Sequence, residues 1–274
     1  KIIDSIIYLA ENGIKNIELS GGTSFYDNFL QDILETKDKY GLNFRCHNYF
    51  PPPKEPFILN LASLDDEIFN TSFEHIIKAL KISNEIGARK FGFHAGFFIN
   101  IKLQEIGKKI PFREFFDRNA SINRFCDAFK KLKTISEDLG IKIYVENNVF
   151  SSENAKSYPG ENPFMLTCYE DYKDLKNKID FNLLLDVAHL KVSCNTLSLN
   201  WHKEFDKMIS NTDYIHISDN DSLTDQNLQL KPNSELLSML KNHNLSKKDF
   251  TLEVYENISN IKKSYDLLEQ ALLW

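Results

Sequence analysis

The chain contains 274 residues, of which 42% are hydrophobic and 26% carry charge, a balance typical of a globular protein with a sizeable core. Its formal net charge is −6, so it lacks the basic character with which nucleic-acid binders neutralise phosphates. No apolar run approaches the roughly 20 residues that a membrane-spanning helix needs. We therefore expect neither a nucleic-acid partner nor a membrane partner.

The four cysteines, Cys46, Cys126, Cys168 and Cys194, are widely spaced in the sequence. None belongs to a CxxC pair of the kind that binds metals or exchanges disulfides. We expect buried, reduced thiols, which indicates a cytoplasmic protein.

Helical and β-like patterns alternate along the whole chain. Short apolar and β-branched runs predict seven strands, at residues 15–19, 42–47, 89–94, 141–146, 181–186, 213–218 and 250–255. Apolar residues at helical spacing predict helices at residues 2–12, 25–39, 71–86, 112–139, 169–179, 201–209, 234–240 and 258–273, the fourth as one long helix or two. Glycines such as Gly41 and Gly87 stand where these helices should stop.

Strands separated by helices imply right-handed crossovers and parallel pairing. An open doubly wound sheet and a closed barrel both satisfy this rule. We favour the barrel because polar residues stand at nearly every strand end, whereas an open sheet concentrates its site at one switch point. The predicted fold is α/β, a (β/α)8 TIM barrel in which residues 1–274 form a single domain. Because only seven strands are found, we expect the first strand to be missing upstream of Lys1.

Two long loops follow strand ends in this arrangement. Residues 49–62 contain three consecutive prolines, and residues 147–163 are rich in serine, asparagine, proline and glycine. On a barrel both loops would overhang the face that carries the site and would set specificity. Simple surface connection is the alternative interpretation of each.

Four strand ends carry the residues that are best suited to chemistry. Glu146, Asp186, His216 and Glu253 provide three carboxylates and one imidazole, a set that suits one divalent ion such as Mn²⁺, Mg²⁺, Co²⁺ or Zn²⁺. Each residue alone would be equally consistent with an isolated polar strand cap. Carboxylates seldom end apolar strands unless something pairs them, so the four together predict a metal site.

Three further histidines and one carboxylate are candidates for substrate contact: His189, His94, His47 and Glu18. His189 follows Asp186 by three residues and can turn back toward the same pocket. A hydrogen-bonded structural role is the alternative for the histidines, and a buried salt bridge is the alternative for Glu18. The remaining histidines, His75, His202 and His243, are expected at the surface.

The motifs CHNYF, FILNLAS, FGFHAGF, YVENN, LLLDVAHL, IHISDND with DQN, and LEVY together resemble the xylose-isomerase-like TIM-barrel superfamily. That superfamily includes sugar and sugar-phosphate isomerases and epimerases, and also endonuclease IV-type apurinic endonucleases. The resemblance extends from Ile17 to Tyr255. It implies the barrel fold but does not by itself select the activity.

The nuclease branch implies a trinuclear zinc site. Its ligands would fall on His47, His94, Glu146, Asp186, His189, His216, Asp225, Glu253 and a histidine two residues after Asp225. The last position is Asn227, whose neutral amide is a poor zinc ligand. Asp225 is thus kept only as a ligand for an additional metal.

The isomerase and epimerase branch implies one metal on Glu146, Asp186, His216 and Glu253, with His189 contacting the substrate. All five residues are present. Some ketose epimerases carry an arginine six residues after the metal-binding histidine, and Ser222 stands there in this chain. The sugar contact of that arginine is therefore absent or comes from another residue.

We hypothesise a divalent-metal-dependent sugar or sugar-phosphate isomerase or epimerase of carbohydrate metabolism. It would act through an enediolate, with Glu146 and Glu253 as paired acid and base on the two faces of a small-molecule carbohydrate. The alternatives are a zinc apurinic endonuclease and a non-catalytic metal-binding barrel. A homodimer is kept open as the oligomeric state.

Overall fold

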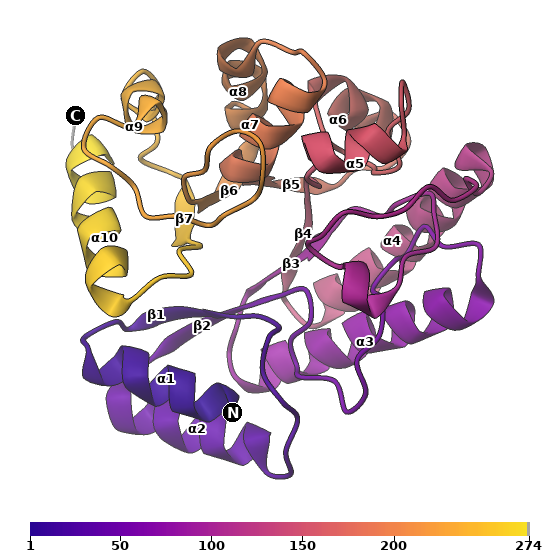
Figure 1. The fold of residues 1–274 in the computed structure, drawn as a ribbon. Coiled ribbons are helices and arrows are strands. Elements are labelled where there is room, and N and C mark those ends of the chain that lie inside the picture. Colours follow the sequence, from indigo (N-terminus) through magenta and orange to yellow (C-terminus); the bar gives the residue numbers. More distant parts are fainter. Residues whose placement is uncertain (273–274) are drawn as a thin grey trace. The chain divides into compact units, whose positions relative to one another are not determined.

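The computed structural model describes residues 1–272, in which strands alternate with helices as predicted (Figure 1). The strands are β1 (Asn16–Leu19), β2 (Asn43–His47), β3 (Lys90–His94), β4 (Lys142–Glu146), β5 (Asn182–Asp186), β6 (Thr212–Ile217) and β7 (Asp249–Leu252). They follow one another in chain order in one sheet, and the pairs β1–β2, β2–β3, β5–β6 and β6–β7 are parallel. This strand order is that of a TIM barrel, so the predicted fold class is confirmed.

Two compact units divide the described chain. The first consists of Lys1–Lys108, Arg113–Val145 and Lys178–Phe181. The second consists of Lys109–Phe112, Glu146–Asn177 and the chain from Asn182 onward. The boundary passes through β4, whose last residue, Glu146, is counted with the second unit.

The first unit contains β1 to β3, most of β4, and the helices α1 (Ile2–Glu11), α2 (Phe29–Tyr40), α3 (Asp66–Glu85) and α4 (Arg118–Asp138), with a short 3-10 helix η1 (Leu103–Glu105). Side-chain caps determine where its two long helices begin. Asp65 accepts hydrogen bonds from the backbone amides of Glu67 and Ile68, and Asp117 accepts one from Ala120. The segment expected as one helix or two, residues 112–139, thus forms one helix that starts only at the Asp117 cap.

The second unit contains β5 to β7 and the helices α5 (Ser152–Ser157), α6 (Tyr169–Lys176), α7 (Val187–Thr196), α8 (Trp201–Ile209), α9 (Glu235–Leu240) and α10 (Ile258–Leu272). Two of these helices are not predicted from the sequence. Helix α7 has buried residues on all sides, so it shows no amphipathic period. Helix α5 has only six residues and lies in the predicted loop, where Ser151 caps it. Leu273, the last residue of the expected terminal helix, lies outside the described residues.

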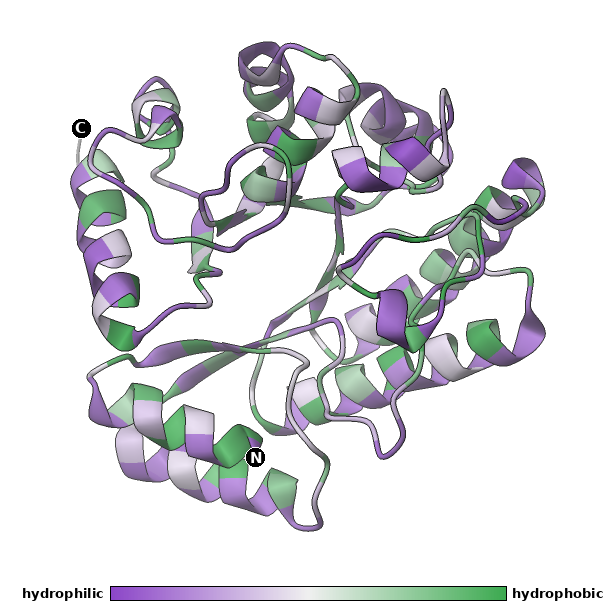
Figure 2. Ribbon diagram, in the orientation of Figure 1, coloured by the Kyte–Doolittle hydropathy of each residue, from purple (hydrophilic) through white to green (hydrophobic). Residues whose placement is uncertain are grey.

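The core of each unit lies between its strands and the apolar sides of its helices. Figure 2 shows both hydrophobic (green) and hydrophilic (purple) residues on these helices. All four cysteines are buried and form no disulfide, as expected. His75, expected at the surface, is buried because it packs against the rings of Tyr49 and Phe57. Among the described residues, no helix is long and apolar enough to span a bilayer.

One close backbone approach in the first unit fixes the segment that follows β3. Asn60 accepts hydrogen bonds from the backbone amides of Ala62 and Phe97, and its amide donates to the carbonyl of Phe97. Gly96 lies in this crossing, where an added Cβ would stand 2.4 Å from the Ala62 Cβ and 2.8 Å from the Asn60 Oδ1. The motif FGFHAGF therefore needs glycine at position 96 because there is no room for a side chain, and not because of an unusual backbone angle.

Replacing Gly96 by alanine should lower the free energy of unfolding by about 1–3 kcal/mol, because the new methyl group overpacks a rigid crossing. Urea unfolding of the wild type and the variant measures this change. In an Ala62→Gly background, where the nearer clash is removed, the same substitution should cost clearly less. Equal costs in the two backgrounds would contradict this explanation.

Candidate metal and active site

Four predicted ligands come together in the second unit. Glu146 ends β4, Asp186 ends β5, His216 lies near the end of β6, and Glu253 directly follows β7. Each offers one ligand atom, and these atoms all lie within 4.8 Å of one another. Glu253 is predicted within a strand that runs to residue 255, but β7 ends at Leu252. The residue therefore stands on the connection beyond the strand.

Asp186 links the strand end to the following helix. Its Oδ1 accepts a hydrogen bond of 2.7 Å from the backbone amide of His189 and so caps α7. Its Oδ2 is buried and has no hydrogen-bond partner within residues 1–272. A buried carboxylate oxygen in this state is costly unless a cation or proton compensates its charge.

Asn147 joins the ends of β4 and β5. Its side-chain amide donates to the carbonyl of Asp186 at 2.9 Å, and its Oδ1 accepts from the amide of Asp186 at 2.8 Å. These two hydrogen bonds engage the N–H and the C=O of Asp186, as backbone pairing would, at the point where the strands end. They fix the backbone of one predicted ligand directly beside that of another, Glu146.

The imidazole of His216 lies between two of the carboxylates. Its Nδ1 is 3.0 Å from the Glu253 Oε2 and 3.3 Å from the Glu146 Oε1. The side chains of His216 and Glu146 are 1% and 0% exposed, whereas that of Glu253 is 19% exposed. Glu253 thus forms the more accessible side of the group.

His189 is held at both ring nitrogens. Its Nδ1 donates to the carbonyl of Asn147 at 2.9 Å, and its Nε2 lies 3.2 Å from the Asp225 Oδ2. Burial opposes ionisation of the ring, but the charges of Asp186, Asp225 and Glu146 outweigh it and hold the pKa of His189 well above its usual value. In the metal-free site these charges favour the protonated ring, whose Nε2–H points at Asp225.

Burial, together with the charges of the neighbouring carboxylates, raises the pKa of Asp186 to about 7 against the lowering effect of His189. Mutual repulsion of carboxylates in a buried site is what a divalent cation relieves. The donor set of three carboxylates and one imidazole suits Mn²⁺, Mg²⁺, Co²⁺ or Zn²⁺. Together with the unpartnered Asp186 oxygen, these residues fit such an ion.

Asp225 and Asn227 lie beside the group but are tied to the protein. The amide of Asn227 donates to the Asp225 Oδ2 at 3.4 Å, and its carbonyl oxygen accepts from the Ser218 hydroxyl at 3.2 Å. Both polar ends of Asn227 therefore have protein partners. Asp225 contacts His189 rather than belonging to the four-residue group.

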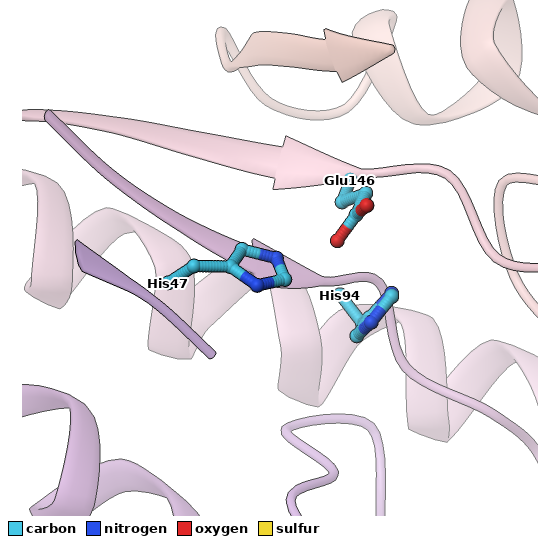
Figure 3. Close-up of side chains that lie close together, drawn as sticks. All are labelled: His47, His94 and Glu146. Atoms are coloured by element: carbon cyan, nitrogen blue, oxygen red, sulfur yellow. The ribbon is translucent and has the colours of Figure 1, made fainter. Parts of the chain in front are cut away.

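His47, His94 and Glu18 belong to the first unit. His47 and His94 end β2 and β3, and their rings lie 5.5 Å apart, edge to face. Figure 3 shows them with Glu146, at the end of β4, and the three side chains offer a second set of ligand atoms within 4.8 Å. Glu18 lies within β1 opposite Arg45 of β2. Its role as a substrate contact stays a prediction.

Two residues that support the site are not predicted from the sequence. The role of Asn147 cannot be predicted from the sequence, because it depends on hydrogen bonds to the neighbouring strand β5. Tyr255, whose hydroxyl donates to the Glu253 Oε1 at 2.6 Å, follows Glu253 by two residues. Alternation in an extended segment puts such residues on one side, so this signal is present in the sequence.

The chain belongs to the xylose isomerase-like TIM barrel family, whose model matches residues 6–271. This match establishes the family that the sequence motifs resemble. No significant match to a curated protein was found by sequence comparison.

Solved structures share the fold over almost the whole chain. A D-tagatose 3-epimerase-like protein superposes with a TM-score of 0.72 at 18% identity, covering 98% of this chain and 92% of its own. The 3-keto-D-glucoside 4-epimerase from E. coli superposes with a TM-score of 0.65 at 12% identity, and the match covers 100% of this chain and 94% of that protein. A Thermus thermophilus protein soaked with ZnCl2 superposes with a TM-score of 0.59 at 16% identity, and the match covers 97% of this chain and 93% of that protein. At these identities the likeness shows the fold alone.

Adding Mn²⁺ to metal-free protein should raise its melting temperature, because the ion binds only the folded site. At one hundred times the Kd, linkage gives about 2.7 kcal/mol, or roughly 5 °C for a chain of this size. Asp186→Asn should remove most of this shift while its side-chain oxygen still caps α7. Asp266→Asn, on the exposed face of α10, is the matched control and should keep the full shift. A full shift in the Asp186 variant would contradict the assignment.

The stabilisation by Mn²⁺ should also depend on pH. The folded-state pKa of Asp186, about 7 against an ordinary value of 3.8, means that the folded protein holds a proton which the unfolded chain lacks between these values. The stability of metal-free protein should therefore fall as the pH rises through this window. Below pH 7 the ion must displace that proton, so the apparent Kd for Mn²⁺ should weaken about tenfold from pH 8 to pH 6. Calorimetric titration measures it, and an unchanged Kd would refute the competition.

Proposed function

We propose that this protein is a divalent-metal-dependent isomerase or epimerase of a small keto or aldo sugar. The observation that carries the proposal is the convergence of Glu146, Asp186, His216 and Glu253, with ligand atoms within 4.8 Å. Membership of the xylose isomerase-like family and the fold shared with sugar epimerases support it. The carbohydrate is its partner in this proposal, with or without a phosphate group.

The chain's own residues can supply the proton transfers. Glu146 and Glu253 approach the same His216 nitrogen, so two carboxylates border one space. In the proposed reaction one carboxylate removes the proton from the carbon beside the sugar carbonyl, and the other returns it. Return on the opposite face inverts the carbon, and return to the adjacent carbon interconverts aldose and ketose.

The ring of His189 lies beside this space and is fixed by Asn147 and Asp225. We assign its Nε2–H, which points at Asp225 in this structure, to donate instead to a substrate oxygen, since a buried ring N–H is a strong donor to developing negative charge. A divalent ion, when bound by the four ligands, would supply Lewis-acid stabilisation of the enediolate charge. His47, His94 and Glu18 are proposed as further substrate contacts.

Two observations favour this function over an apurinic endonuclease. Asn227 stands where the nuclease pattern requires a ligating histidine, and both ends of its amide bind Asp225 and Ser218. The chain also has a formal charge of −6, the wrong sign for holding a DNA backbone.

The test is exchange of carbon-bound hydrogen with solvent. With Mn²⁺ in D₂O, the wild type should incorporate deuterium beside the carbonyl of at least one sugar in a panel of ketohexoses and aldohexoses, followed by proton NMR. Glu146→Gln and Glu253→Gln should each slow exchange by about 10²–10⁴-fold, because each removes one acid–base group.

Glu269→Gln, on the exposed face of α10, is the matched control and should exchange at the wild-type rate. Exchange at the wild-type rate in the Glu146 variant would exclude its role. Zinc-dependent incision of abasic duplex DNA by the wild type, with no sugar exchanged, would favour the nuclease instead.

A further inference from the structure

Tyr255 contacts Glu253 of the site through a hydrogen bond that neither metal binding nor folding requires. Its hydroxyl donates to the Glu253 Oε1 at 2.6 Å, while the residue as a whole is 73% exposed. A tyrosine on an open surface usually leaves its hydroxyl to water. Here the hydroxyl instead engages a carboxylate that is only 19% exposed.

The two oxygens of Glu253 face different partners. Oε2 lies 3.0 Å from the His216 Nδ1 and so faces the four-residue group, whereas Oε1 faces the hydroxyl of Tyr255. The terminal torsion of a glutamate is broad and does not by itself fix the plane of the carboxylate. One contact on each oxygen does fix it.

The backbone holds Tyr255 in the place from which it can do this. The amide of Glu253 donates to the carbonyl of Ile217, and the amide of Tyr255 donates to the carbonyl of Asn227, each at 3.0 Å. The carboxylate of Glu256 also accepts from the amide of Gln229 at 2.7 Å. Residues 253–256 are thus fastened along the segment that follows β6, with side chains 253 and 255 on one side.

We propose that Tyr255 is a positioning residue for the reaction: its hydroxyl holds the Oε1 of Glu253 in the orientation for proton transfer and leaves Oε2 to the metal-ligand group. The inference rests on the proposed function of Glu253 as acid or base. It adds a division of labour between the two oxygens of one carboxylate. Tyr255 acts through Glu253 and is not itself assigned a contact with substrate.

The test compares Tyr255→Phe with Tyr265→Phe in the metal-loaded protein. Tyr265 is the matched control, because it is also exposed and its hydroxyl also contacts a glutamate, Glu269 of α10, at 3.2 Å. Loss of a hydrogen bond to a charged group should lower kcat about tenfold in Tyr255→Phe. The KM, the calorimetric Kd for Mn²⁺ and the melting temperature should each stay close to the wild-type value. Tyr265→Phe should change none of these quantities.

Three results would overturn the proposal: an unchanged kcat in Tyr255→Phe, a raised KM with unchanged kcat, or a Kd for Mn²⁺ that weakens as much as kcat falls. The second would make Tyr255 a substrate contact, and the third would make it a support for the metal ligand. If the wild type turns over no sugar, the proposed function fails separately.

Crystal structures of the Mn²⁺-loaded wild type and Tyr255→Phe then decide on the positioning role, since the Glu253 carboxylate should rotate only in the variant. An unrotated carboxylate refutes the positioning role.

Discussion

The burial of carboxylates at the ends of strands is the constraint on which the candidate site depends. Asp186 is fully buried, and one of its oxygens caps helix α7 while the other has no hydrogen-bond partner among the described residues. Burial of such a group without compensation is unfavourable. The nearby imidazolium of His189 and the raised pKa of Asp186 reduce this cost in the absence of an ion. A divalent cation would remove it and would convert a destabilising feature into a functional one.

A surrounding layer of polar residues holds the ligand group in place. Asn147 clamps the ends of β4 and β5 together, Asp225 orients His189, and Tyr255 contacts Glu253. These residues use hydrogen bonds of defined direction, so they determine which oxygen or nitrogen faces the ligand group. Orientation by such partners controls both metal affinity and proton transfer. The layer is therefore as much a part of the proposed mechanism as the four ligands.

Much of the fold and of the ligand group can be predicted from the sequence, because both depend on periodicity. Strand ends can be read from apolar runs, and parallel strands bring their carboxyl ends to one edge, so Glu146, Asp186, His216 and Glu253 are predicted to converge. Helix α7 cannot be predicted because its buried residues, polar ones included, lie on all sides and leave no amphipathic period. Asn147 is missed because a clamp between neighbouring strands has no pattern along the chain. His75 is misplaced because its aromatic partners, Tyr49 and Phe57, come from a proline-rich loop whose path the sequence does not specify.

We propose that four residues of the second unit hold one divalent ion. Anomalous diffraction from crystals soaked in Mn²⁺ tests it most directly, because the ion's own scattering gives both its position and its number. We expect a single strong peak bonded to Glu146, Asp186, His216 and Glu253, with Asn227 still bound to Asp225 and Ser218. Three peaks that also recruit His189 and Asp225, or no peak on these four residues, would contradict it.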